Sequence, residues 1–235
     1  MFHPSILPDR AAAHAELLAR SYLRVEQFMH EPAVRELEAE IADLCSPACT
    51  RSGHFALRDA LGFVITMNGL DRVSDLLFDL ARRDEMLGLA GDLLGKAALS
   101  LHVEYFAKPP HGGTAAPPHQ DHAFYHAHFP DELALSFWIA LDDVDPDGGA
   151  LEYGVGSPLA LLDHVQSPAL DFDYQLPACP ALPFEVAVVP RGGALVHHSY
   201  TVHRTRTNRS ARPRRAVVFN YRGSPYREWL RSEAA

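Results

Sequence analysis

The chain has 235 residues, of which 47% are hydrophobic and 22% charged, an ordinary balance for a globular protein that is long enough to bury its own core. Its formal net charge of −9 argues against nucleic acid as the main partner, because phosphate binding needs a positive surface. No apolar run approaches the ~18 residues of a membrane-spanning helix, and three cysteines without an apolar signal segment favour a reducing cytoplasm.

The first third of the chain has the periodicity of helices. Apolar residues recur there at three- and four-residue spacing, Asp9 suits an N-cap, and Gly95 suits a helix end. Phe63–Met67 is a short apolar run that is compatible with an early strand. We predict helices at about Asp9 to His30, Pro32 to Leu44, Asp71 to Arg83 and Asp84 to Leu94.

After Gly95 the sequence changes to short β-like runs separated by Pro, Gly and Asp. Many short strands at this spacing favour a sandwich, jelly roll or barrel. We expect a single domain over residues 1–235, in which 1–95 are mainly helical support, 96–222 form the β core and 223–235 are a C-terminal tail. The predicted strands lie near Leu99–Phe106, Leu133–Leu141, Ala150–Tyr153, Phe184–Val189, Ala194–His198, Val202–Arg206 and Arg215–Tyr221.

The stretch PPHQDHAFYH, residues 117–126, places His119 and Asp121 two residues apart. In an extended segment residues i and i+2 point to the same face, so this imidazole and this carboxylate can converge on one ion. Two interpretations are open: a polar loop in which histidines gathered by chance, or part of a metal site. A ferrous oxygenase centre needs a second histidine, and the candidates are His197, His198 and His203.

These residues lie within a longer pattern that resembles the phytanoyl-CoA dioxygenase-like family of iron(II)- and 2-oxoglutarate-dependent oxygenases. Members have H-x-D, a long β segment, and then a pattern of the type G-[DG]-x4-H-[SG]-x3-H-x-[ST]-x2-N-x-S-x3-R. The resemblance covers about residues 100–221 and departs at Gly193, where an Asp is common. The late pattern matches Gly192, Gly193, His198, Ser199, His203, Thr205, Asn208, Ser210 and Arg214.

The resemblance implies a double-stranded β-helix, which is a jelly-roll or cupin-like fold, with the N-terminal helices packed on one sheet. It also implies that His119, Asp121 and His203 bind Fe(II). The family position at Arg214 holds the distal carboxylate of 2-oxoglutarate, to which a guanidinium fits bidentately. Arg215, one residue out of phase, should point to the opposite face.

Two further residues are expected at the co-substrate. Thr205 lies two positions beyond His203, so in a regular strand its hydroxyl faces the same cavity. Trp138 is expected mainly to pack in the core, and the family position with which it aligns also borders the co-substrate. His198 suits a packing role or a contact to a ligand, and His197 is expected to face the other way.

The expected reaction consumes dioxygen and 2-oxoglutarate, releases succinate and CO2, and oxidises a C–H bond. Because related halogenases have Gly or Ala in place of the carboxylate, Asp121 favours hydroxylation, desaturation or oxidative ring closure. The expected substrate is a polar small molecule. Our hypothesis is that it is a sugar-containing natural product of antibiotic biosynthesis. A cupin-like metal isomerase or a non-redox binding protein remains the alternative, since the same scaffold serves both.

The loop after the H-x-D motif supplies candidate substrate contacts, although half-exposed loop rings are as common an interpretation. His102 and Glu104 share a strand face, but without a third partner they have no predicted ligand role. The oligomeric state is left open by the sequence. The predicted substrate contacts are His122, Tyr125, His126 and Arg206.

Overall fold

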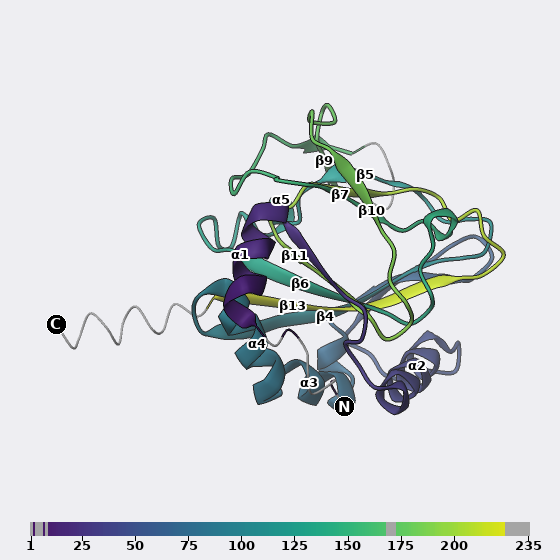
Figure 1. Cartoon of the computed structure of the whole chain (residues 1–235). Helices are drawn as coiled ribbons and strands as arrows, with labels where there is room; N and C mark the ends of the chain where they lie inside the picture. The colour runs from purple at the N-terminus through teal and green to yellow at the C-terminus, as the bar shows by residue number, and fades with distance from the viewer. Residues whose placement is uncertain (1, 3–6, 8, 168–172, 224–235) are drawn as a thin grey trace.

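The computed structural model describes residues 2, 7, 9–167 and 173–223, and in it two antiparallel sheets face each other (Figure 1). The large sheet has the spatial order β1 (Tyr22–Val25), β11 (Ala194–His198), β6 (Ala134–Ala140), β13 (Arg214–Gly223), β4 (Ala98–Lys108), β3 (Val64–Asn68) and β2 (Phe55–Arg58). The small sheet has the order β10 (Phe184–Ala187), β7 (Leu151–Gly154), β12 (His203–Thr205) and β5 (Ala116–His119). The predicted double-stranded β-helix is confirmed.

Helices cover the outer face of the large sheet. Alternation along β13 shows the division, since Val217 and Phe219 pack in the core under the helices, whereas Ala216 and Val218 pack in the smaller core between the sheets. The expected packing of the N-terminal helices on one sheet is therefore confirmed (Figure 1). The four longer helices are α1 (Arg10–Arg20), α2 (Glu31–Cys45), α3 (Asp75–Ala81) and α4 (Asp84–Leu94).

The predicted helix from Asp9 to His30 is wrong in its second half. Asp9 does cap α1, but the helix ends at Arg20, because Ser21 adopts a left-handed conformation with φ of 74° and its N–H donates to Leu17 O. The following Tyr22–Val25 then pairs with β11 as an edge strand. Apolar periodicity over so few residues does not distinguish a helix turn from a strand rich in aromatic and β-branched side chains.

The segment predicted as one helix over residues 71–83 is also divided. A short 3₁₀ turn, Leu70–Arg72, precedes α3, whose N-terminus is capped by Ser74 through a bond from Leu77 N. Three strands before residue 95, β1, β2 and β3, join the large sheet together with later strands. Gly223 ends β13, and the rest of the predicted tail lies outside the described residues.

The remaining elements are short. A helical turn, α5 (His122–Tyr125), follows β5, a 3₁₀ turn spans Pro146–Gly148, and β8 (Val165–Gln166) pairs with β9 (Tyr174–Gln175). The predictions missed β1, β2, β5, β8 and β9. None of the helices within the described ranges has the length and apolar character that crossing a bilayer requires.

Gly193, where the family pattern often has Asp, lies at a close contact between segments. A Cβ at this position would be 2.9 Å from the carbonyl oxygens of both Val25 and Glu26 and 2.4 Å from Val189 Cγ2. Two of these neighbours are backbone atoms, which cannot rotate away as a side chain can. The end of β1 therefore approaches the turn before β11 closely enough to exclude any side chain there.

Gly193→Ala should lower the free energy of unfolding by about 1–3 kcal/mol, the usual cost of overpacking. The measurement is urea denaturation followed by circular dichroism. Gly88→Ala is the matched control, because Gly88 lies in α4 with no atom within 4 Å of its added Cβ, and this change should stabilise the protein. Equal stability of the two variants would contradict the close contact at Gly193.

His198 provides a pH-dependent term in stability. Its ring is fully buried, neither ring nitrogen has a hydrogen-bond partner among the described residues, and burial, aided by His197, lowers its pKa from 6.5 to about 3. Because the folded-state pKa is the lower one, its contribution is fully present above about pH 6.5 and is lost as pH falls towards 3.

His198→Leu should therefore flatten the fall in unfolding free energy between pH 6.5 and 3, measured by urea titration at several pH values. His126→Leu is the control, because His126 is exposed and its replacement should leave the slope unchanged. An unaltered slope in the His198 variant would show that this imidazole is not the group that titrates.

Candidate metal centre

The two histidines of the predicted site are neighbours across the small sheet. His203 opens β12 and His119 ends β5, and the two residues pair directly in the antiparallel register of these strands. Direct partners in an antiparallel pair project to the same face, which brings the two rings to a centroid distance of 4.1 Å. Two ligands separated by 84 positions in the sequence are thus set by one strand pairing.

Each of these rings is held so that Nε2 faces the site. His119 Nδ1 lies 2.8 Å from Pro117 O, and His203 Nδ1 lies 3.0 Å from Thr201 O. A carbonyl oxygen only accepts, so Nδ1 carries the proton in both rings and Nε2 keeps its lone pair. This is the tautomer that binds a metal through Nε2.

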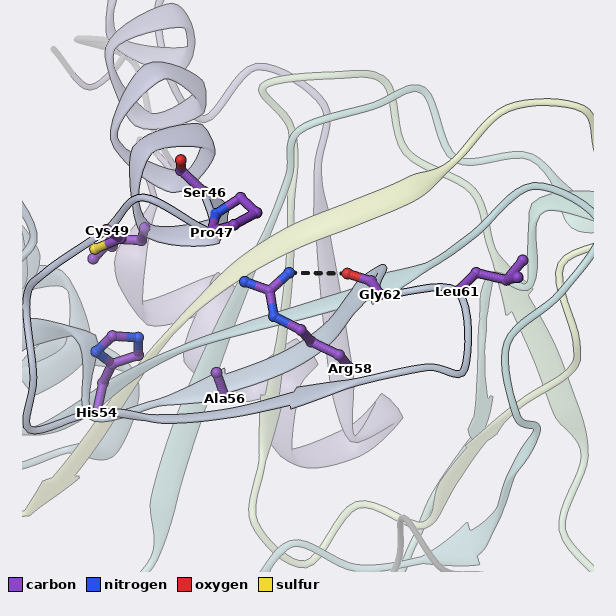
Figure 2. Close-up of a pocket in the computed structure, with 9 residues that line it drawn as sticks. Ser46, Pro47, Cys49, His54, Ala56, Arg58, Leu61 and Gly62 are labelled. Atoms are coloured by element: carbon purple, nitrogen blue, oxygen red, sulfur yellow. Dashed lines mark hydrogen bonds between the residues drawn. The ribbon is translucent and has the colours of Figure 1, made fainter.

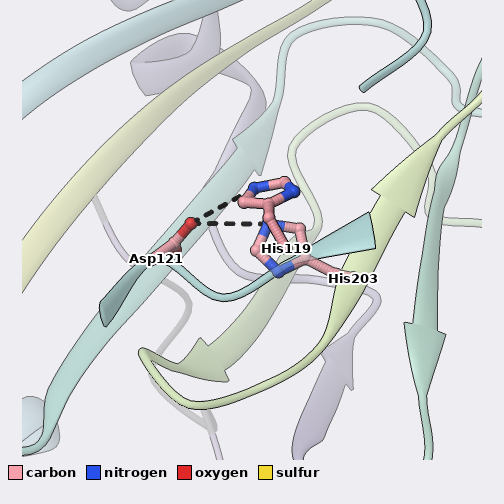
Figure 3. Close-up of side chains that lie close together, drawn as sticks. All are labelled: His119, Asp121 and His203. Atoms are coloured by element: carbon pink, nitrogen blue, oxygen red, sulfur yellow. Dashed lines mark ion pairs between the residues drawn. The ribbon is translucent and has the colours of Figure 1, made fainter. Parts of the chain in front are cut away.

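Asp121 completes the group (Figure 3). Its Oδ1 is 3.6 Å from His119 Nε2 and 3.5 Å from His203 Nε2, and ligand atoms of the three residues all lie within 4.8 Å of one another. Two imidazoles and one carboxylate on one side of a shared point match the facial triad of non-heme iron oxygenases. The chain reaches this arrangement through a turn, because Asp121 has helical φ and ψ of −58° and −26° ahead of α5, and not through the extended segment that we expected.

The second oxygen of Asp121 is held by different groups. His197 Nε2 lies 3.1 Å from Oδ2, and Ser136 Oγ lies 3.3 Å from it. Tyr153 supports His197 in turn, since its hydroxyl is 3.0 Å from His197 Nδ1. With Tyr153 donating to Nδ1, the His197 Nε2–H donates to the carboxylate. Asp121 thus presents Oδ1 to the centre and has Oδ2 fixed from behind.

The expectation for the adjacent histidines is therefore wrong. His197 was expected to face away, yet it contacts Asp121, whereas His198 lies on the helix-covered face of β11. The prediction assumed that strand alternation continues from His203 back to His197. It failed because a loop, Ser199–Val202, separates β11 from β12.

The electrostatics prepare these groups for a cation. Burial alone would raise the pKa of the Asp121 carboxyl, but the imidazoles of His203, His119 and His197 outweigh it and hold that pKa well below its usual range. Burial, aided by His119, lowers the pKa of His203 to about 3. At neutral pH the carboxylate is ionised and His203 is neutral, which is the protonation state that metal binding requires.

Arg214 lies on the inner face of β13, at the same side as the centre. Its side chain is buried, its guanidinium carbon is 5.3 Å from the Trp138 ring centre, and no described residue accepts a hydrogen bond from it. Burial lowers its pKa to about 10, so the group is charged at neutral pH. A buried cation without a partner is costly, and this observation indicates that an anion completes the site.

Arg215 has the opposite environment. It bonds to Asp142, with the Nη2–Oδ1 distance at 2.6 Å, and to Glu38, with the Nη2–Oε1 distance at 2.9 Å, on the outer side of the sheet. The predicted alternation of the two arginines agrees with this arrangement. Thr205 follows His203 on β12 and accepts a bond from Ala116 N at 3.2 Å, where the β12–β5 register shifts.

The predicted substrate contacts have diverse environments. The Tyr125 ring packs edge-on against His102 with centroids 6.0 Å apart, and burial, with the carboxylates of Glu104 and Asp121, raises the pKa of its hydroxyl. His122 is fully buried with its ring nitrogens on Pro130 O, at 3.0 Å, and Ser199 Oγ. The other two are exposed: His126 packs on the ring of His122, and Arg206 pairs with Glu152 at 2.5 Å.

Sequence reasoning missed one residue inside the motif itself. Gln120, between the two ligands, is fully buried and its amide nitrogen donates to Ala160 O and Tyr200 O at 3.0 and 2.6 Å. Its amide oxygen accepts from Leu162 N at 2.8 Å, so the side chain fastens the loop after β7 to the metal centre. Nothing in the spacing of the motif signals this role.

Comparison with known protein families shows which family contains this chain. The sequence profile of the family Phytanoyl-CoA dioxygenase (PhyH) matches residues 21–216. The chain belongs to this family. It is accordingly an Fe(II)- and 2-oxoglutarate-dependent dioxygenase with an H-x-D…H triad, as the resemblance implied.

Among curated relatives of this phytanoyl-CoA dioxygenase family member is an L-proline trans-4-hydroxylase from Streptomyces griseoviridis. It is 26% identical over 223 residues, which are 85% of this chain and 81% of the relative. Phytanoyl-CoA dioxygenase domain-containing protein 1 from Rattus norvegicus is 30% identical over 123 residues, which are 49% of this chain and 42% of the rat protein.

Solved structures share the fold. AviO1 from Streptomyces viridochromogenes Tue57 matches with a TM-score of 0.72 at 21% identity, covering 94% of this chain and 97% of AviO1. The epimerase SnoN from nogalamycin biosynthesis, in complex with Fe3+, alpha ketoglutarate and nogalamycin RO, matches with a TM-score of 0.72 at 21% identity, covering 92% and 84%.

The residues present fit both cofactors of the family. Two imidazoles that direct Nε2 towards an ionised carboxylate suit Fe(II), and the buried Nε of Arg214, which has no hydrogen-bond partner among the described residues, suits an anionic co-substrate. Bound together, iron, 2-oxoglutarate and dioxygen supply the oxidising power of the reaction. The protein's own residues hold and orient these groups.

Arg214→Lys should raise the KM for 2-oxoglutarate by about 10- to 100-fold, since a lysine cannot reproduce a bidentate bond to a carboxylate. The measurement is succinate release at varied 2-oxoglutarate. Arg215→Lys is the control, because Arg215 binds Asp142 and Glu38. The KM of this variant for 2-oxoglutarate should stay unchanged. A larger effect at residue 215 would place the co-substrate on the other face of β13.

Proposed function

We propose that this dioxygenase oxidises a C–H bond of a polar small molecule, by hydroxylation or oxidative ring closure, and releases succinate and CO2. A sugar-containing natural product, of the kind made in antibiotic biosynthesis, is the proposed substrate. The observation that carries the proposal is the buried Arg214, whose Nε has no hydrogen-bond partner in the described part of the chain, on the same side as a His, Asp and His group. An isomerase or a simple metal-binding protein has no need of such a cation.

In this proposal each side chain has one task. His119, Asp121 and His203 hold the iron, and Asp121 does so through Oδ1 while His197 donates to Oδ2. Arg214 binds the distal carboxylate of 2-oxoglutarate. Three further residues contact the co-substrate or the substrate in this proposal. Trp138 packs on Arg214, and Thr205 follows His203 on β12. Tyr125 stays protonated near Asp121.

Two of the four predicted substrate contacts are engaged with other protein groups. His122 bonds to Pro130 O and Arg206 to Glu152, and exposed His126 contacts His122. We therefore retain Tyr125 as the substrate contact of this group. We also propose that the enzyme works in the cytoplasm, where its free thiols at Cys45, Cys49 and Cys179 would stay reduced.

The nature of the substrate is supported by the names of relatives. One relative is a hydroxylase of L-proline, and two matching structures are an epimerase and a carbocyclase from nogalamycin biosynthesis. All act on polar molecules or natural products according to these names. The polar groups around the triad suit such a molecule better than an acyl chain.

Anaerobic addition of Fe(II) and 2-oxoglutarate should produce a weak visible charge-transfer band, and air should then yield succinate. Asp121→Ala should abolish both, because the ionised ligand is lost, whereas exposed Asp173→Ala should preserve them. Mass spectrometry of polar metabolites should then show a gain of about 16 Da for hydroxylation or a loss of about 2 Da for ring closure. Absence of both the band and succinate would contradict the proposal.

A further inference from the structure

The inner face of the large sheet carries polar side chains beside the proposed iron and 2-oxoglutarate sites. Strand register arranges them in two neighbouring rows across the sheet. The first row contains His102, Asn220, Ser136 and His197. The second row contains Phe55, Asn68, Glu104, Val218 and Trp138.

Hydrogen bonds join these rows to the metal centre. Asn220 Nδ2 donates to Glu104 Oε2 at 2.8 Å, and the Ser136 hydroxyl donates to Asn220 Oδ1 at 2.7 Å. Ser136 Oγ is also 3.3 Å from Asp121 Oδ2. The Tyr125 ring packs edge-on against His102, with the ring centroids 6.0 Å apart. The polar rows therefore begin beside an iron ligand.

At the other end of the rows lies a cavity of about 590 Å³. This size is within the range of small-molecule pockets, about 300–1,000 Å³. Its position on β2, β3 and β4 is beyond the half of the sheet that carries Arg214 and Trp138. The side chains that decide its chemistry are His54, Phe55, Asn68, Arg72, His102 and Glu104.

Glu104 gives the cavity an acceptor that is not saturated. Its carboxylate is largely buried and receives Asn220 at 2.8 Å, His102 Nε2 at 3.3 Å and, in the amide orientation that satisfies both its atoms, Asn68 at 3.1 Å. A carboxylate has about four acceptor positions, so one remains for a ligand.

Donors face the same space. Arg72 lines the cavity, and its guanidinium forms no ion pair with any residue in the described ranges, whereas His54 lines both this cavity and the neighbouring one beside Cys49. One carboxylate and one arginine roughly balance in charge. A cavity with adjacent donors and acceptors and little net charge suits hydroxyl groups, because a hydroxyl both donates and accepts.

Phe55 adds an apolar surface at this polar cavity. Its ring is 57% exposed although it is a large hydrophobic side chain, and it is the cross-strand partner of Asn68. Exposed aromatic rings beside polar groups mark binding surfaces. A sugar ring has a face of C–H groups and a rim of hydroxyls, which matches a phenyl ring next to a carboxylate, an amide and a guanidinium.

We propose that this cavity binds a glycosyl ring of the substrate, with hydroxyls on Glu104 and Arg72 and a C–H face on Phe55. The proposal rests on the proposed function and specifies the substrate class of the same site. The ring would lie over β4, β3 and β2, and the hydrogen-bonded side chains of Asn220 and Ser136 would connect Glu104 with the neighbourhood of Asp121.

The other cavity on β2 does not compete for this role (Figure 2). It measures about 540 Å³ and lies on the opposite face of the strand, where Ala56 and Arg58 project towards the end of α2. The Arg58 guanidinium is already bonded to Gly62 O at 2.9 Å and Cys45 O at 2.8 Å. The hydrogen bonds that lead to Asp121 start from the inner face alone.

The test is saturation-transfer NMR on the full chain with Zn(II) in place of iron and with 2-oxoglutarate. The probes are methyl glycosides of glucose, mannose and rhamnose, with L-proline as the comparison ligand. At least one glycoside should receive saturation, most strongly at the C–H groups of one ring face. Phe55→Ala and Glu104→Gln should each weaken it by about tenfold, the loss expected for one contact to a charged or aromatic group.

Phe78→Ala and Glu16→Gln are the controls, because both residues are exposed elsewhere and should leave binding unchanged. The proposal is overturned if no glycoside receives saturation, if L-proline alone does, or if Phe55→Ala and Glu104→Gln both bind like the parent. The charge-transfer band with Fe(II) is recorded separately for every variant. If the protein shows that band but binds no glycoside, the proposed sugar site is wrong and the proposed function still stands.

Discussion

The pairing of His203 with His119 across β12 and β5 is the constraint on which the site depends. It fixes two metal ligands on the small sheet, and the turn after β5 then brings Asp121 to the same point. The facing large sheet supplies everything else: His197 and Ser136 behind Asp121, and Arg214 farther along. A metal bound between two sheets can be contacted by side chains from both sheets, and the double-stranded β-helix provides this arrangement.

Arginine charge is used in two different ways along β13. Arg215 satisfies Asp142 and Glu38 on the outer side and stabilises the surface under α2, whereas Arg214 is buried without a carboxylate. The first arrangement contributes to folding, and the second leaves an uncompensated charge in the folded protein. Binding of a dicarboxylate would neutralise that charge. The unfavourable burial of Arg214 in the free protein therefore contributes to the affinity for the co-substrate.

The sequence predicted the site better than the fold around it. His119 and Asp121 could be found because metal chemistry restricts both residue type and spacing, and His203 and Arg214 because they match positions in the family pattern. The strand β1 was predicted as helix, since its few residues carry no decisive period. His197 and Gln120 were missed because their roles depend on a loop and on a distant segment, neither of which is encoded in local spacing.

The short strand that carries His119 also has a consequence for how the protein behaves beside its own copies. β5 is the last strand of the small sheet and contains Pro117 and Pro118, which have no N–H group to offer. Its remaining donor near that end, Ala116 N, is bonded to Thr205. An edge with two prolines in four residues offers few donors to a further strand, so the ligand-bearing margin disfavours intermolecular β-association.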